Sequence, residues 1–186
     1  MPHTNMLEAN LAALVVIDVQ EKMHAAIGSI AQGVLVANIA KLIAVARILE
    51  IPVLLTEQYP QGLGGTVQQI RDAAPTLKPM VKTTCSCWRD EPFRAALQAT
   101  GREHIILAGA ETHVCVQQTA LDLLRVDYVP FVPEDAVGSR RSTDADAAFR
   151  RMARAGVELT TTESIIFELI ERCDHPKFKD VLKLVK

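Results

Sequence analysis

The sequence lacks the features that mark several large classes of protein. No run of Lys or Arg is long enough to follow a phosphate backbone, and the formal net charge is −2. We therefore expect no nucleic-acid partner. No apolar run approaches the ~20 residues that a membrane-spanning helix needs, so we expect no membrane partner either.

Cysteine is sparse, and its spacing is uninformative by itself. Cys85, Cys87, Cys115 and Cys173 form neither the paired CxxC spacing of a zinc site nor the dense framework of a small disulfide-linked domain. Reduced thiols are the expectation. The amino-terminal segment MPHTNMLEAN also lacks the basic and apolar regions of a signal peptide, so we expect a soluble, unexported, cytoplasmic protein.

What the sequence does contain is enough apolar material for one core. Hydrophobic residues make up 49% of the 186 positions. No repeat, low-complexity tract or Ser/Gly-rich linker interrupts them. We therefore predict a single domain over residues 1–186.

Short apolar runs alternate with helical patterns along the whole chain. Residues 12–17 (AALVVI) are too short for a helix and predict a strand that is buried on both faces. Apolar residues then recur at helical spacing from Leu35 to Leu49, and residues 53–57 restart as a strand. The remaining predicted strands cover residues 104–108, 128–132 and 157–161, and the remaining helices 91–100, 114–124, 144–155, 164–171 and 176–185.

This alternation predicts an α/β fold. We expect a single-domain, three-layer α/β/α architecture with a mainly parallel, doubly wound sheet of about six strands. In such sheets, ligands bind beyond the carboxyl ends of the strands.

Three reactive side chains fall at such strand ends: Asp18, Lys82 in PMVKTT, and Cys115 in AGAETHVCVQQT. Each has an ordinary explanation, because a strand-end carboxylate often caps a helix, a lysine is usually on the surface and a free cysteine often behaves as a small hydrophobe. Together they suit thiol chemistry. A thiolate at Cys115 is favoured by a nearby cation and a helix start, and Asp18 can accept and return a proton.

Four stretches, in this order and spacing, resemble one family. AALVVIDVQ, TEQYPQGLGGT, MVKTTCSCW and AGAETHVCVQQTALDLL are similar to the isochorismatase-like cysteine hydrolases. The loop TEQYPxGLG and the tail HPKFKDVLKLVK resemble the branch of isochorismatase domain-containing proteins. The resemblance covers nearly the whole chain.

The resemblance implies a site. The family's Asp, Lys and Cys triad corresponds to Asp18, Lys82 and Cys115. A cis peptide is implied between Ala110 and Glu111, and the backbone N–H groups of Glu111 and Cys115 are implied as an oxyanion hole. For the substrate pocket we expect Gln20, Gln58, Trp88, Glu111 and Thr112.

Departures from other branches of the family narrow the chemistry. Members that cleave isochorismate typically carry another residue at the nucleophile position, so Cys115 argues against that substrate. The nicotinamidase branch has an Asp-x-His metal motif where this chain has TEQYPQGLGGT, which contains no histidine. We therefore predict no metal and no cofactor, and we do not expect nicotinamidase activity.

Several residues keep two explanations. The glycine-rich loop matches no phosphate-binding template and either closes over the pocket through Gln58 or is a plain connection. His113, two residues from Cys115, is expected at the pocket rim or in a structural role rather than in a dyad. Trp88 either packs or walls the pocket, and Cys173 is expected to be structural.

The carboxyl-terminal stripe also has two explanations. Its apolar residues indicate first a helix face that packs on the core, and by resemblance an oligomer contact. They are Phe178, Val181, Leu182 and Val185.

The leading hypothesis is a cysteine hydrolase that acts on a C–N bond of a small amide-like or related acyl substrate through a Cys115 thioester. The alternative is a catalytically silent binding or scaffold protein of the same fold. A weaker alternative is a redox protein that uses Cys85 and Cys87. As partners we expect a small-molecule substrate and, by resemblance, further copies of the chain in a dimer or larger homo-oligomer.

Overall fold

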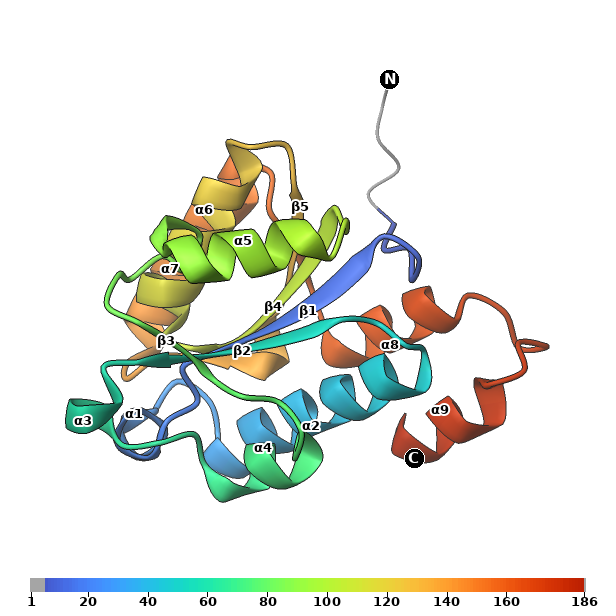
Figure 1. Ribbon diagram of the computed structural model, residues 1–186, viewed down its shortest axis with the longest axis horizontal. Coiled ribbons are helices and arrows are strands. Elements are labelled where there is room, and N and C mark those ends of the chain that lie inside the picture. Colours follow the sequence, from blue (N-terminus) through green and yellow to red (C-terminus); the bar gives the residue numbers. More distant parts are fainter. Residues whose placement is uncertain (1–5, 186) are drawn as a thin grey trace.

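A computed structural model describes residues 6–185 of the chain. Half of the amino-terminal segment on which the expectation of an unexported protein rests, and the last residue of the tail motif, lie outside these residues. Strands and helices alternate from β1 to β7, as the sequence pattern predicts (Figure 1). No helix within residues 6–185 has both the length and the apolar character needed to cross a membrane.

Every strand pair in the sheet is parallel. The main path runs β3-β2-β1-β4-β5-β7, with the two-residue β6 paired to the end of β4. This arrangement confirms the predicted parallel, doubly wound sheet. The strands are β1 (Ala12–Ile17), β2 (Val53–Gln58), β3 (Met80–Lys82), β4 (His104–Ala110), β5 (Val129–Pro133), β6 (Val137–Gly138) and β7 (Glu158–Thr160).

The long helices lie close to their predicted positions, and the differences concern short elements. Three short helices, α1, α3 and α4, and two short strands, β3 and β6, occupy segments for which the sequence pattern predicted no element. The helix expected over residues 114–124 instead starts as a π-helical turn, Thr112–Val116, and continues as α6. The helices are α1 (Glu21–Ala26), α2 (Gln32–Ile48), α3 (Pro60–Leu63), α4 (Gln68–Ala73), α5 (Glu91–Ala99), α6 (Gln117–Leu124), α7 (Ser142–Ala155), α8 (Thr162–Ile170) and α9 (Phe178–Val185).

The sheet separates two apolar cores, and β1 contributes to both. Because successive side chains of a strand point to opposite faces, Leu14 and Val16 enter the core under α2, α8 and α9, whereas Val15 and Ile17 enter the core under α5, α6 and α7. The two layers of helices are seen on either side of the sheet in Figure 1. This burial on both faces explains why β1 is an unbroken apolar run.

The carboxyl-terminal helix packs on the first of these cores. Val181 is buried, and Phe178 and Val185 pack against the same cluster beside α2. Three of the four predicted residues of the stripe therefore face the core, whereas Leu182 does not belong to this cluster and Leu184 packs there instead.

The order of the strands creates a switch point between β1 and β4. From β1 the chain builds outward through β2 and β3, and it then returns to place β4 on the other side of β1. At this point Gly109 has a φ of 121°, and a Cβ there would collide with the carbonyl oxygen of Ile17. Glycine therefore allows β4 to lie close against the end of β1, where a ligand site is expected.

Candidate active site

The carboxyl ends of three strands place the candidate residues together. Asp18 follows β1 directly, Lys82 is the last residue of β3, and Cys115 lies in the π-helical turn after β4. Their exposed fractions are 0%, 1% and 4%. Since β3 is two strands away from β1, the Lys82 side chain has to extend past the end of β2 to reach Asp18.

Asp18 is fixed by its backbone and by two hydrogen bonds. Its φ of 50° places it in the left-handed region, which aspartate tolerates better than most residues. Thr56 Oγ1 donates to Oδ1 at 2.7 Å, and Lys82 Nζ donates to Oδ2 at 2.6 Å. Both carboxylate oxygens therefore have partners in a site that excludes solvent.

The Lys82 ammonium is surrounded by acceptors. Besides Asp18, it donates to Gln58 Oε1 at 2.7 Å and to the carbonyl of Thr84 at 3.2 Å, and it lies 3.7 Å from Cys115 Sγ. Burial acts to lower the pKa of Lys82, but the charge of the Asp18 carboxylate and its hydrogen bond oppose this, and the pKa is raised overall. Lys82 therefore stays protonated at neutral pH.

Cys115 differs from the sequence-based expectation in its protonation state. Burial raises the pKa of its thiol, and the Asp18 carboxylate adds to this rise more than the Lys82 ammonium opposes it. The reason is that Lys82 is already neutralised by its ion pair with Asp18. Burial and the Asp18 carboxylate therefore favour a neutral thiol over the thiolate that the sequence pattern suggests.

The backbone around Cys115 contains a cis peptide bond and a π-helical turn. The Ala110–Glu111 peptide bond is cis. The Glu111 carbonyl accepts hydrogen bonds from the N–H groups of Val114 and Val116, which closes a wide π-helical turn. Such turns occur mostly as single turns associated with α-helices, and they are frequent at functional sites. The backbone N–H groups of Glu111 and Cys115 belong to this turn.

A cavity of about 370 Å³ opens at Cys115. Its volume is at the small end of the range for ligand pockets. The residues that line it are Lys22, Met23, Ala26, Gln58, Leu63, Cys85, Glu111, Val114, Cys115 and Arg140.

Two of the five expected pocket residues, Gln58 and Glu111, line this cavity, and the other three do not. Gln20 is fully buried and bridges two loops instead, because its amide donates to the carbonyls of Gln58 and Gly64. Trp88 packs edge-on against Tyr128 at 5.5 Å. Thr112 is fully buried in the π-helical turn.

Sequence reasoning missed several residues of the site. The sequence pattern identifies Thr56, which donates a hydrogen bond to Asp18, only as part of a strand. Arg140 comes from the β6–α7 connection, where its signal in the sequence is no more than a pair of adjacent arginines. Lys22 and Leu63 come from α1 and α3, short helices without a clear pattern.

The remaining cysteines and His113 are accounted for by their contacts. All four cysteines are free thiols. Cys85 is exposed at the cavity, whereas burial raises the pKa of Cys87 to about 12. His113 Nδ1 lies 3.0 Å from Ser139 Oγ, which is the contact of a structural histidine. Within residues 6–185 no three His, Cys, Asp or Glu side chains are grouped to hold a metal ion.

Comparisons with known proteins agree with the resemblance. The model of the isochorismatase domain matches residues 12–164. Isochorismatase domain-containing protein 1 of Salmo salar is 40% identical over 169 residues, which cover 91% of this chain and 59% of that protein. The chain thus spans less than two thirds of the length of that relative.

Solved structures of similar chains share the fold. The structure of MAR1 ribonuclease from Caenorhabditis elegans has a TM-score of 0.90 and 40% identity, with 97% of this chain and 92% of that chain covered. The YcaC gene product of Escherichia coli, described as an octameric hydrolase of unknown specificity, has a TM-score of 0.87 and 25% identity, with 98% and 97% covered.

Proposed function

The chain belongs to the isochorismatase family, and on that premise we propose that it is a cysteine hydrolase that cleaves the C–N bond of a small amide or related acyl substrate. One observation carries this proposal: a buried Asp18–Lys82 ion pair adjoins the Cys115 thiol at a small cavity. A carboxylate, an ammonium and a thiol together supply a base, a positive charge and a nucleophile.

In the proposed first step, Cys115 Sγ attacks the carbonyl carbon as its proton moves to Asp18. Because the resting thiol is neutral, this transfer accompanies the attack instead of preceding it. Lys82, 3.7 Å from the sulfur, stabilises the negative charge that develops there. The new C–S bond gives a tetrahedral intermediate.

In the tetrahedral intermediate, the negative charge on the former carbonyl oxygen of the substrate needs hydrogen-bond donors. We assign this role to the backbone N–H groups of Glu111 and Cys115, which belong to the same turn as the nucleophile. Preorganised N–H donors of this kind are worth ~2.7–4 kcal/mol of transition-state stabilisation.

The second half of the reaction returns the site to its starting state. Asp18 gives the proton to the leaving amine, the C–N bond breaks, and a thioester remains on Cys115. A water molecule then loses its proton to Asp18 and attacks the thioester. The carboxylic acid leaves, and the proton on Asp18 passes back to the Cys115 sulfur.

A Cys115→Ala variant tests the proposal. Ammonia release from a panel of small primary amides is measured for the wild type, for Cys115→Ala and for Cys173→Ala, a matched control because Cys173 is exposed and distant from the cavity. We expect about a 10³-fold or greater loss in Cys115→Ala, since the nucleophile is gone, and wild-type rates in the control. Retention of activity by a folded Cys115→Ala protein would refute the nucleophile assignment.

Two other functions would give different results with the same three proteins. A silent binding protein of this fold would release no ammonia from any amide and would show the same low signal in all three proteins. Cleavage of RNA is the activity named for the similar C. elegans protein, and it would appear as Cys115-dependent loss of RNA. The net charge of −2 and the small cavity favour an amide over RNA.

A further inference from the structure

Arg140 supplies a positive charge to the wall of the cavity. This residue follows β6 and, with Lys22 from α1, supplies two positive charges to the lining, against the single carboxylate of Glu111. The Asp18–Lys82 pair behind Cys115 adds no net charge. The lining is therefore positive by one unit, and this points to an anionic ligand.

Arg140 is held in place on a rigid segment. The preceding residue, Ser139, is fully buried. Its carbonyl accepts from the N–H groups of Gly28 and Ser29, and its own N–H donates to Ser29 Oγ at 2.8 Å. The position of Arg140 is thus fixed by its neighbours before any ligand arrives.

Glu111 binds one edge of the Arg140 guanidinium and leaves its other edge available to a ligand. Glu111 Oε1 accepts from Arg140 Nε at 2.9 Å and from its backbone N–H at 3.2 Å. Within residues 6–185 the two terminal NH₂ groups make no hydrogen bond, and 61% of the side chain is exposed, against 13% for Glu111. A planar pair of N–H donors on a fixed guanidinium matches a carboxylate.

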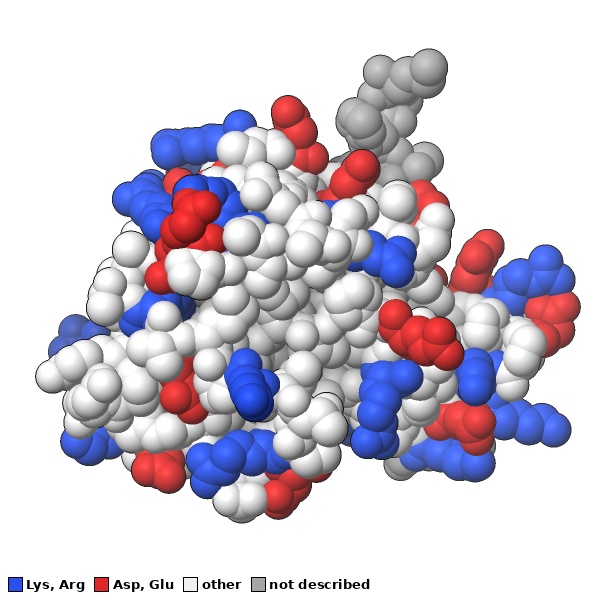
Figure 2. Space-filling model, viewed as in Figure 1, with Lys and Arg blue, Asp and Glu red and all other residues white. Residues whose placement is uncertain are grey.

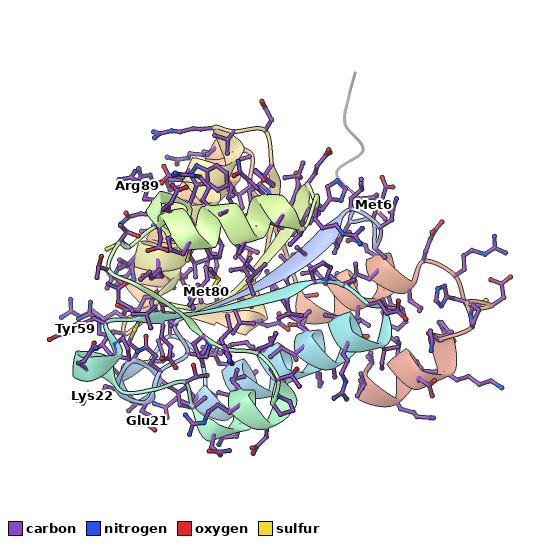
Figure 3. All side chains as sticks on the ribbon, viewed as in Figure 1. Met6, Glu21, Lys22, Tyr59, Met80 and Arg89 are labelled. Carbon is purple, nitrogen blue, oxygen red and sulfur yellow. The ribbon has the colours of Figure 1, made fainter. Side chains whose placement is uncertain are left out.

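Lys22 contributes a second, weaker cation. Its Nζ donates to the carbonyl of Gly62 at 2.7 Å, which leaves further N–H groups for a ligand. Figure 3 shows Lys22 at the end of the molecule where α1 and α3 lie. Apolar side chains, among them Met23, Leu63 and Val114, make up part of the cavity lining.

From this arrangement we propose that the substrate carries a carboxylate that Arg140 binds, so that the molecule is a small carboxylic acid with an amide at its other end. The amide faces Cys115, a short apolar linker contacts the walls, and the carboxylate accepts two hydrogen bonds from Arg140. A single negative charge balances the lining, whereas a phosphate dianion does not. The inference rests on the proposed hydrolase for the amide and on Arg140 for the carboxylate.

Two alkylating reagents test the carboxylate site without any turnover. Iodoacetate and iodoacetamide react with the same sulfur and differ in whether they carry a carboxylate. The rate of modification of Cys115 by each is followed by peptide mass spectrometry, and their ratio is divided by the ratio for N-acetylcysteine amide. We expect this normalised ratio to exceed one by about tenfold, because the charge-assisted hydrogen bonds concentrate iodoacetate at the cavity.

Three variants locate the effect. Arg140→Gln should lower the normalised ratio to about one, and Arg140→Lys, which keeps the charge without the planar pair of donors, should give an intermediate value. Arg141→Gln is the matched control, because Arg141 is an adjacent exposed arginine that does not line the cavity. It should leave the ratio at the wild-type value.

The outcomes separate the two proposals. A wild-type ratio near one, or equal ratios in Arg140→Gln and Arg141→Gln, would overturn the carboxylate site whatever the enzyme hydrolyses. A ratio that depends on Arg140, in a protein that releases no ammonia from succinamate or glutaramate, would support the carboxylate site and count against the hydrolase. If both hold, Arg140→Gln should raise the KM for glutaramate far more than it changes kcat.

Discussion

At the residue scale, Cys115 lies beside two opposite charges that largely cancel each other. The Lys82 ammonium is 2.6 Å from the Asp18 carboxylate and 3.7 Å from the sulfur. Since the carboxylate and burial act in the same direction, they raise the pKa of the thiol. The raised pKa favours the protonated form of the thiol at neutral pH.

This charge balance predicts an unusual effect of Asp18→Asn. Removing the carboxylate leaves Lys82 as the only charge beside Cys115, so the pKa of Cys115 should fall. The pH profile of Cys115 alkylation should shift to lower pH, with a faster rate at pH 7 than in the wild type, while amide hydrolysis is lost with the base. Iodoacetamide labelling across pH 6–10 measures the shift. An unchanged or upward shift would show that Asp18 does not hold the thiol protonated.

The Asp18–Lys82 ion pair should contribute measurably to the free energy of unfolding. Lys82→Met leaves the buried Asp18 charge unpaired and should cost about 3–5 kcal/mol in the free energy of unfolding. In the double variant Asp18→Asn, Lys82→Met both charges are gone, so the total cost should be less than the sum of the two single changes by about 1–3 kcal/mol. Urea unfolding of the four proteins measures this coupling, and additive costs would contradict a buried pair.

At the scale of elements, the site depends on how closely the end of β4 approaches the end of β1. Gly109 pairs with Ile17 in the sheet, next to Asp18 and to the Ala110–Glu111 bond. The sequence pattern predicts the end of β1 correctly, because β1 is a local apolar run, but it ends the next predicted strand at residue 108, two residues before the end of β4 at Ala110. It did not predict the π-helical turn, because this turn is defined by hydrogen bonds to the Glu111 carbonyl and not by a pattern of apolar residues.

A pair of glycine substitutions tests this close approach. Gly109→Ala should lower the free energy of unfolding by about 2–4 kcal/mol, because φ is 121° and the new Cβ meets the Ile17 carbonyl. Gly33→Ala in α2 is the control, since nothing lies within 4 Å of the added atom. It should be neutral or stabilising by up to about 1 kcal/mol. Thermal unfolding of both variants gives the answer, and equal effects would contradict the close packing of the two strands.

At the scale of the whole molecule, the formal net charge is only −2. Figure 2 shows acidic and basic side chains interspersed around a largely uncharged centre, with no basic stripe on the face in view. This distribution is consistent with a small-molecule substrate. The expected single domain over residues 1–186 and the cytoplasmic location stay predictions.

The homo-oligomer that the family resemblance implies stays a prediction. The similar E. coli protein is described as octameric. Size-exclusion chromatography with light scattering should give a mass that is a multiple of the 20.4 kDa chain. A single species at 20.4 kDa at micromolar concentration would show that the isolated chain does not need a partner copy.

The sequence by itself determined the alternation of the longer strands and helices, and with it that Asp18 directly follows one buried strand and that Cys115 lies shortly after another. Short apolar runs and helical spacing are local properties, so they can be recognised along the chain. The tertiary structure decided the rest. The reach of Lys82 past β2, the neutral Cys115 thiol and the Glu111–Arg140 pair depend on distances and burial between residues remote in sequence, which no local pattern records.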